Sequence, residues 1–149
     1  MKHGISYITA IILSLWILSL SSCEIETHSK GNIDGNWHLV EIDTLDTGGI
    51  NDFRNTRIFW GIQANFVQLK DNDIVDNPLI LRFDLTNDMF LLYEPHINDR
   101  ENNDPEITDI SLLSHYGINE LHESFLVEKL SATKLTLKSS KLRLFFEKF

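Results

Sequence analysis

Two histidines in the last third of the chain, His115 and His122, are candidate metal ligands because Glu120 and Glu123 lie beside them. A helical zinc site places its histidines four residues apart on one face of a helix. Here the histidines are seven residues apart, and Gly117 between them interrupts a helix. We therefore interpret both histidines as surface residues of a loop.

Two acidic segments carry oxygen ligands of the kind that calcium prefers. Residues 71–76 lack the glycine at the sixth position and the distal bidentate glutamate of an EF-hand loop. Residues 99–109 would gather a cation only if the segment folded back on itself. Solvated loops explain both segments, so we expect neither a metal ion nor another cofactor.

The sequence also lacks the motifs of the common enzyme classes. It contains no Gly-x-Ser-x-Gly elbow, no Walker loop and no dinucleotide-binding fingerprint. Aspartate and glutamate are plentiful, but nothing in the sequence pairs two of them across a cleft as a glycosidase requires. We therefore predict that the protein is not an enzyme.

The single cysteine, Cys23, follows a segment with the order of a secretory signal. Lys2 precedes an uncharged run whose apolar centre, residues 8–20, is 13 residues long. A membrane-spanning helix needs about 20 residues. We therefore interpret residues 1–22 as a signal peptide rather than as a transmembrane helix. A lone cysteine cannot form an intrachain disulfide, so another role is expected for this thiol.

The tetrad Leu20-Ser21-Ser22-Cys23 resembles the lipobox of bacterial lipoproteins. The resemblance implies that the thiol of Cys23 receives a diacylglycerol and that the chain is cut just before it. Two or more acyl chains hold a protein stably on a membrane. We therefore expect a lipoprotein of the cell envelope, anchored in the outer membrane and facing the periplasm or the cell surface.

The charge of the chain limits its partners. The formal net charge is −9, and loss of Lys2 with the signal would leave 12 of the 13 basic residues against 22 acidic ones. A negative surface repels phosphate backbones, which excludes nucleic acid as an expected partner. It also disfavours contact with anionic headgroups, so the lipid on Cys23 is the expected link to the membrane.

Residues 23–33 are polar and predict a flexible tether, whereas residues 34–149 have the length of a single domain. Apolar residues alternate with a period of two through most of this domain, which is typical of strands. The predicted strands are 37–42, 57–70, 79–85, 89–94, 124–130, 134–138 and 141–148. One helix is predicted at residues 107–116, before the last three strands.

This pattern predicts a mainly β fold, an antiparallel meander that forms either a closed barrel or a two-sheet sandwich. Gly35-Asn36-Trp37 resembles the Gly-x-Trp that opens the first strand of lipocalins. The resemblance implies a small barrel of about eight strands with Trp37 at its bottom. It also implies a basic side chain packed over the tryptophan ring. We favour Arg143 for this contact, with Lys141 as the alternative.

The whole chain resembles the small lipocalin-like lipoproteins of gut-dwelling Gram-negative bacteria. Inward-pointing aromatic residues would line any ligand pocket of such a barrel. The candidates are Trp37, Trp60, Phe66, Phe83 and Tyr93. Small barrels either fill with such side chains or hold one small ligand. A filled core is the more frequent outcome, but Ala64 and Gln68, on the predicted face of Trp60, would leave space.

Two functions follow from these expectations. The first is a membrane-anchored binding module that holds a small apolar or amphipathic ligand. The alternative is a non-enzymatic interaction or structural module of an envelope protein complex. Its contacts would lie on the two long loops, residues 43–55 and 98–109, because loops on a rigid scaffold often carry such contacts.

Overall fold

The computed structural model describes residues 33–149. The predicted signal peptide, the lipid attachment site at Cys23 and the predicted tether up to residue 32 lie outside the described residues. Ile33, which we assigned to the end of the tether, is fully buried and belongs to the core. The barrel and its core lie within residues 33–149, so we expect this part of the chain to fold without the residues that precede it.

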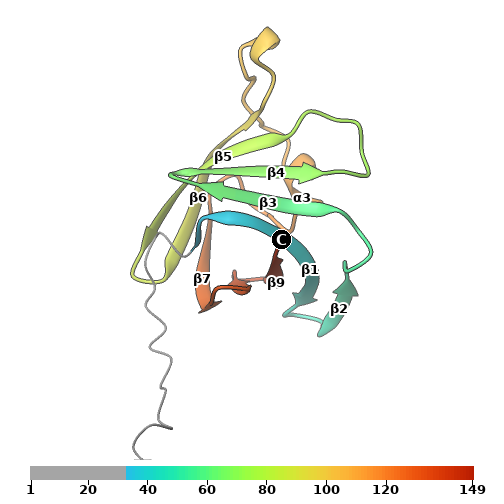
Figure 1. The fold of residues 1–149 in the computed structure, drawn as a ribbon, viewed down its shortest axis with the longest axis vertical. Helices are drawn as coiled ribbons and strands as arrows, with labels where there is room; N and C mark the ends of the chain where they lie inside the picture. Colours follow the sequence, from blue (N-terminus) through green and yellow to red (C-terminus); the bar gives the residue numbers. More distant parts are fainter. Residues whose placement is uncertain (1–32) are drawn as a thin grey trace, which may run out of the picture.

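The described residues form one antiparallel sheet of nine strands (Figure 1). The strands are β1 (Gly35–Thr44), β2 (Gly49–Asp52), β3 (Ile58–Gln63), β4 (Phe66–Asp71), β5 (Leu79–Thr86), β6 (Met89–Ile97), β7 (Glu123–Leu130), β8 (Lys134–Lys138) and β9 (Leu142–Lys148). Each strand from β3 to β8 pairs with the next, and β1 pairs with both β3 and β9. Eight strands therefore close a barrel, and β2 is an extra strand beside β1. The predicted lipocalin-like meander is confirmed.

The predicted strand at residues 57–70 is in fact a hairpin of β3 and β4. Ala64 has a positive φ of 58° in the turn, and Gln63 pairs directly with Phe66. Residues that pair directly across two strands share a face of the sheet. Phe66 therefore points outward with Gln63, although its parity in the sequence is that of the inward-pointing Trp60. Alanine is uncommon at a positive φ, and Asn65 is the one common turn residue at this position, so the sequence signal for the turn is weak.

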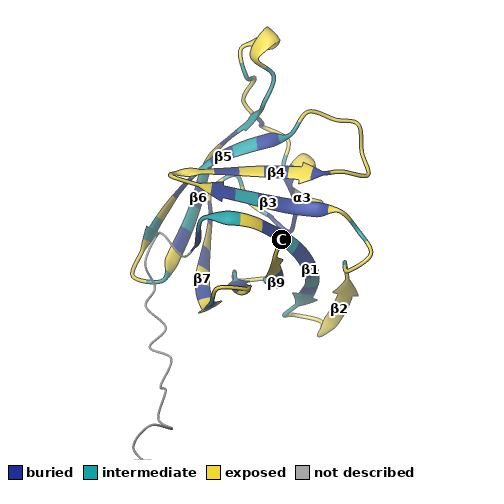
Figure 2. Cartoon of the chain, viewed as in Figure 1, coloured by how far each residue is buried: buried dark blue, intermediate teal, exposed yellow. Residues whose placement is uncertain are grey.

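Aromatic side chains fill the barrel. The largest fully buried ones are Trp37, Trp60, Phe83, Phe90, Phe125 and Phe146. The ring centroids of Trp60 and Phe146 are 5.0 Å apart, and those of Phe83 and Phe90 are 4.9 Å apart. Buried and exposed residues alternate along the strands (Figure 2), as the period of two predicted. The filled interior is the outcome that we considered more frequent for a barrel of this size.

The long connection between β6 and β7 covers one end of the barrel. It holds the short helices η1 (Arg100–Asn102) and α3 (Ser111–Ser114), so the predicted helix at residues 107–116 is only one turn long. Its apolar residues Ile107, Leu113 and Ile118 are buried in the core. We call residues 107–118 the plug segment. They close the barrel at the end where β1 finishes and β9 begins.

Candidate functional site

Only three of the five aromatic residues predicted to line an interior pocket lie together inside the barrel. Trp37, Trp60 and Phe83 are at most 1% exposed and belong to the packed core. Phe66 is 39% exposed on the outside of β4. Tyr93 pairs with Arg82 on the outside of β6, where desolvation, with the nearby Asp84 carboxylate, raises the pKa of its hydroxyl.

The cation that packs over Trp37 is Lys148, so the prediction of Arg143 or Lys141 was wrong. The Lys148 Nζ atom lies 4.8 Å from the centroid of the Trp37 ring and donates a hydrogen bond of 2.8 Å to the carbonyl oxygen of Asp34. The register of β1 and β9 places Lys148 opposite Trp37 and places Arg143 opposite Asp43, farther along the strands.

Arg143 instead forms an ion pair with Glu128 on the outside of the barrel. Its Nε atom lies 2.7 Å from Oε2 of Glu128, and its Nη2 atom lies 3.2 Å from Oε1. Hydrogen bonds from this guanidinium lower the pKa of the Glu128 carboxyl. Arg143 therefore has a local partner near the end of the barrel away from Trp37.

An open groove of about 1130 Å³ lies on the outside of the barrel, and we call it the outer groove. The outer faces of β1, β3, β4, β5 and β6 form its floor and one side. The loop that carries η1 forms the other side and projects from the barrel beside β5 (Figure 1). Its lining residues come from separate strands and one loop, so no local motif in the sequence marked it.

A glycine on β3 gives the outer groove its depth. Gly61 lies on the floor between Asn36 and Gln68. A Cβ atom at this position would lie 3.8 Å from the carbonyl oxygen of Gln68 and 3.9 Å from Oδ1 of Asn36, which are ordinary contacts. Since Gly61 has no side chain, the outer face of β3 stays open here, although a larger residue would fit.

One side of the groove carries an aromatic ring and an ion pair. The guanidinium carbon of Arg82 lies 5.0 Å from the centroid of the Phe66 ring. Its Nε atom lies 2.9 Å from Oε2 of Glu94. Both charges are partly exposed, so the pair adds little stability. It does fix the position of Arg82 over Phe66.

The opposite side holds a histidine and a partly buried carboxylate. Nδ1 of His96 lies 2.9 Å from the carbonyl oxygen of Asp104. A carbonyl oxygen can only accept, so Nδ1 carries the hydrogen and Nε2 of the neutral ring is an acceptor. The Oδ1 atom of Asp104 is buried and has no hydrogen-bond partner within the described part of the chain. This oxygen is therefore ready to accept a hydrogen bond.

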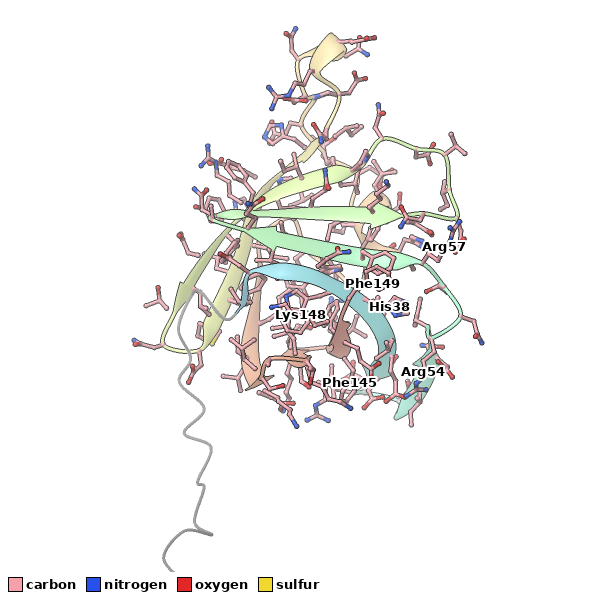
Figure 3. The ribbon with its side chains drawn as sticks, viewed as in Figure 1. His38, Arg54, Arg57, Phe145, Lys148 and Phe149 are labelled. Carbon is pink, nitrogen blue, oxygen red and sulfur yellow. The ribbon has the colours of Figure 1, made fainter. Side chains whose placement is uncertain are left out.

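A second surface feature is an aromatic cluster where the chain ends on the outside of β1 and β3 (Figure 3). The Phe59 ring lies 5.1 Å from His38 and 5.2 Å from Phe149, measured between centroids. Two nearby cations are paired, Arg54 with Asp52 and Glu41, and Arg57 with Asp73. Lys70 lies directly opposite Phe59 on β4 and has no ion pair among the described residues, so the cluster presents an aromatic surface beside one free cation.

The histidines that we first considered as metal ligands do not lie together with other ligands. Nε2 of His115 lies 2.8 Å from Oδ2 of Asp71, a hydrogen bond that ties the plug segment to β4. His122 is exposed. Within residues 33–149, no three histidine, cysteine, aspartate or glutamate side chains are grouped closely enough to hold a metal ion.

Glu123, at the start of β7, is a buried carboxyl below the plug segment. Its Oε2 atom accepts a hydrogen bond of 2.6 Å from the backbone N–H of Asn119. Burial raises the pKa of Glu123, and this hydrogen bond opposes the rise. The carboxyl therefore fixes residue 119, directly after the plug segment.

The chain belongs to the lipocalin-like domain family, whose sequence profile matches residues 18–149. A lipocalin-like protein from Bacteroides uniformis has a TM-score of 0.60 and 20% identity, and the match covers 80% of this chain and 100% of that chain. An uncharacterized protein from Bacteroides eggerthii has a TM-score of 0.56 and 19% identity, and the match covers 78% of this chain and 98% of that chain. No curated protein matches the chain. The part of the chain from residue 33 onward has no helix long and apolar enough to cross a membrane.

Proposed function

We propose that the protein is a lipid-anchored binding module that holds a small ligand in the outer groove rather than inside the barrel. The observation that carries this proposal is the contrast between a filled interior and an open groove of about 1130 Å³. Ligand pockets commonly measure about 300–1,000 Å³ and combine apolar walls with a few polar groups. The outer groove provides apolar walls and polar groups, and membership of the lipocalin-like domain family supports a role in ligand binding.

The lining favours an amphipathic ligand over a wholly apolar one. Ala64, Phe66 and Ile80 provide apolar surface in the groove, whereas Gln68 and Glu94 provide polar groups beside it. A wholly apolar ligand would cover these polar groups without pairing them, which costs free energy. We therefore expect a ligand that has both an apolar part and a polar part.

The position of the groove is consistent with an anchor at Cys23. Asp34 and Asn36 line the groove, so it lies where the described chain leads back toward Cys23. The nine residues between Cys23 and Ile33 make ten Cα-to-Cα steps, which span at most about 35 Å. The groove would then stay close to the outer membrane, on its periplasmic or its outer face, and would exchange ligand with that surface.

Membrane fractionation tests the anchor. We expect the full-length protein to incorporate an alkyne-tagged fatty acid and to sediment with outer membranes. The Cys23→Ser variant should lose the label and appear in the soluble fraction. A variant that still sediments with membranes and still carries the label would refute lipid attachment at this cysteine.

Native mass spectrometry tests the binding site. The chain of residues 31–149 is mixed with a panel of fatty acids, bile acids, alkyl glycosides and neutral oligosaccharides. Gly61→Phe fills the groove from its floor, whereas Ser124→Phe adds the same bulk on the exposed outer face of β7. We expect Gly61→Phe to lose the bound ligand and Ser124→Phe to keep it. Binding that survives Gly61→Phe would place the site elsewhere, and no binding by any panel member would reject the proposal.

One observation favours the second candidate, an interaction module of an envelope complex. The predicted loop at residues 43–55 contains β2, whose four residues are all exposed and whose outer edge pairs with no strand in the described part of the chain. Ile50 on β2 is 68% exposed. A photo-crosslinking residue at position 50 in living cells would capture one specific envelope protein under this alternative. Capture of only abundant membrane proteins would reject it.

A further inference from the structure

Four side-chain amides line the outer groove. They belong to Asn36, Gln63, Gln68 and Asn103. In the part of the chain that the structure describes, none of these four amides forms a hydrogen bond through its side chain. Each carboxamide offers two donor hydrogens and one acceptor oxygen side by side. Such a group can bind two neighbouring hydroxyls at once, one as donor and one as acceptor.

The charges around the groove nearly cancel. Asp34, Glu94 and Asp104 are acidic, whereas Arg82 and Arg100 are basic. Arg82 and Glu94 already form an ion pair with each other. A strongly charged ligand of either sign would meet a like charge in this groove, since opposite charges are interspersed. The lining therefore favours a neutral ligand.

Three groups on the side of the groove that holds His96 and the η1 loop can form further hydrogen bonds. The buried Oδ1 atom of Asp104 and the Nε2 atom of His96 both accept hydrogen bonds. The guanidinium of Arg100 only donates, and it has no partner among residues 33–149. A ligand that fits must supply donors and acceptors within a short distance, as hydroxyl groups do. The ring of Phe66 adds an apolar surface for the carbon face of such a ligand.

Other ligand classes match this lining less well. A fatty acid would cover the four amides without pairing them, which costs free energy. An extended peptide would need a free strand edge for backbone pairing, but β3, β4 and β5 each pair on both sides. A phosphorylated ligand would lie against the carboxylates of Asp34 and Asp104.

We infer that the outer groove binds a neutral oligosaccharide. The inference names the ligand class of the groove described above and therefore rests on the proposed function. The amides and the Asp104 carboxylate bind hydroxyls, Arg100 donates to ring or hydroxyl oxygens, and Phe66 contacts a sugar ring. The amphipathic character proposed above is that of a sugar, with polar edges and less polar faces.

Isothermal titration calorimetry tests the inference with the chain of residues 31–149. The probes are neutral hexasaccharides of glucose, mannose, xylose and N-acetylglucosamine. Oligogalacturonate and chitosan hexamers serve as charged counterparts, and lauric acid and deoxycholate serve as amphiphiles without sugar. We expect at least one neutral hexasaccharide to bind, and to bind more tightly than any charged counterpart.

Two matched pairs of variants locate the site. Gln68→Ala should weaken binding about tenfold, the ratio that corresponds to one lost hydrogen bond, whereas Asn51→Ala removes an exposed amide of β2 and should change nothing. Gly61→Phe should abolish binding, and Ser124→Phe should not. Each variant is checked for an unchanged melting temperature.

The outcomes separate this inference from the proposed function. Binding of the amphiphiles but of no saccharide, lost in Gly61→Phe, would overturn the oligosaccharide and leave the binding module standing. Tighter binding of a charged hexamer than of every neutral one would also overturn the inference. Binding of nothing in either panel would overturn both. Saccharide binding that is unaffected by Gln68→Ala and Gly61→Phe would overturn the assignment to this groove.

Discussion

Replacement of Gly117 by alanine tests whether the plug segment closes the barrel as a packed part of the core. Gly117 has a φ of +84°, and a Cβ atom there would lie 2.7 Å from Cδ2 of Leu144 and 3.3 Å from Cδ1 of Ile42. Left-handed backbone strain costs about 1–2 kcal/mol, and overpacking of a filled core costs about 1–3 kcal/mol. We therefore expect Gly117→Ala to lower the free energy of unfolding by about 2–5 kcal/mol.

Two other glycines separate the strain from the packing. Gly48 has a φ of +68°, and no atom lies within 4 Å of the place that a Cβ atom would take, so Gly48→Ala should cost only the strain, about 1–2 kcal/mol. Gly61 has an ordinary strand conformation, and a Cβ atom there would make only ordinary contacts. Because alanine loses less conformational entropy than glycine, Gly61→Ala should be neutral or stabilising by up to about 1 kcal/mol.

Urea unfolding measures all three variants, with tryptophan fluorescence as the probe because Trp37 and Trp60 are fully buried. Linear extrapolation gives the free energy of unfolding in water. The expected order of loss is Gly117→Ala, then Gly48→Ala, then Gly61→Ala. Equal losses for Gly117→Ala and Gly48→Ala would refute the packing of the plug segment against the barrel.

Three further substitutions test single contacts. Lys148→Gln should lower the free energy of unfolding by about 0.5–1 kcal/mol, because the cation over Trp37 is lost; the urea midpoint measures this. Burial raises the pKa of Glu123, so the stability that the protonated carboxyl contributes is present at low pH and is lost as pH rises through the folded-state pKa. In melting curves from pH 4 to 8, Glu123→Gln should remove this part of the fall in melting temperature. His115→Ala should cost about 1–3 kcal/mol and speed hydrogen exchange in the plug segment, because it deprives the buried Asp71 carboxylate of a partner.

Each of these three has an outcome that would contradict its reasoning. An unchanged urea midpoint in Lys148→Gln would show that the cation over Trp37 adds no stability. An unchanged dependence of the melting temperature on pH in Glu123→Gln would show that this carboxyl does not titrate differently in the folded state. Exchange in the plug segment that is the same in His115→Ala as in the unchanged protein would show that the hydrogen bond to Asp71 does not hold this segment.

Much of the fold was predictable from the sequence because buried and exposed residues alternate along each strand of a small barrel. The period of two identified β1, β5, β6 and β7 to β9, and the Gly35-Asn36-Trp37 motif pointed to a lipocalin-like barrel. The hairpin between β3 and β4 was not predictable, since the turn uses Ala64 at a positive φ. The missed turn also reversed the predicted direction of Phe66.

The candidate site was decided by the tertiary structure alone. The register of β9 against β1, not the local sequence, brings Lys148 rather than Arg143 to Trp37. The outer groove collects residues from five strands and from the loop after β6, and its depth depends on a glycine that reads in the sequence as a weak strand position. Alternation along one strand reports which face is buried. It carries no information on which strands curve around the same hollow, because closure and register depend on the whole sheet.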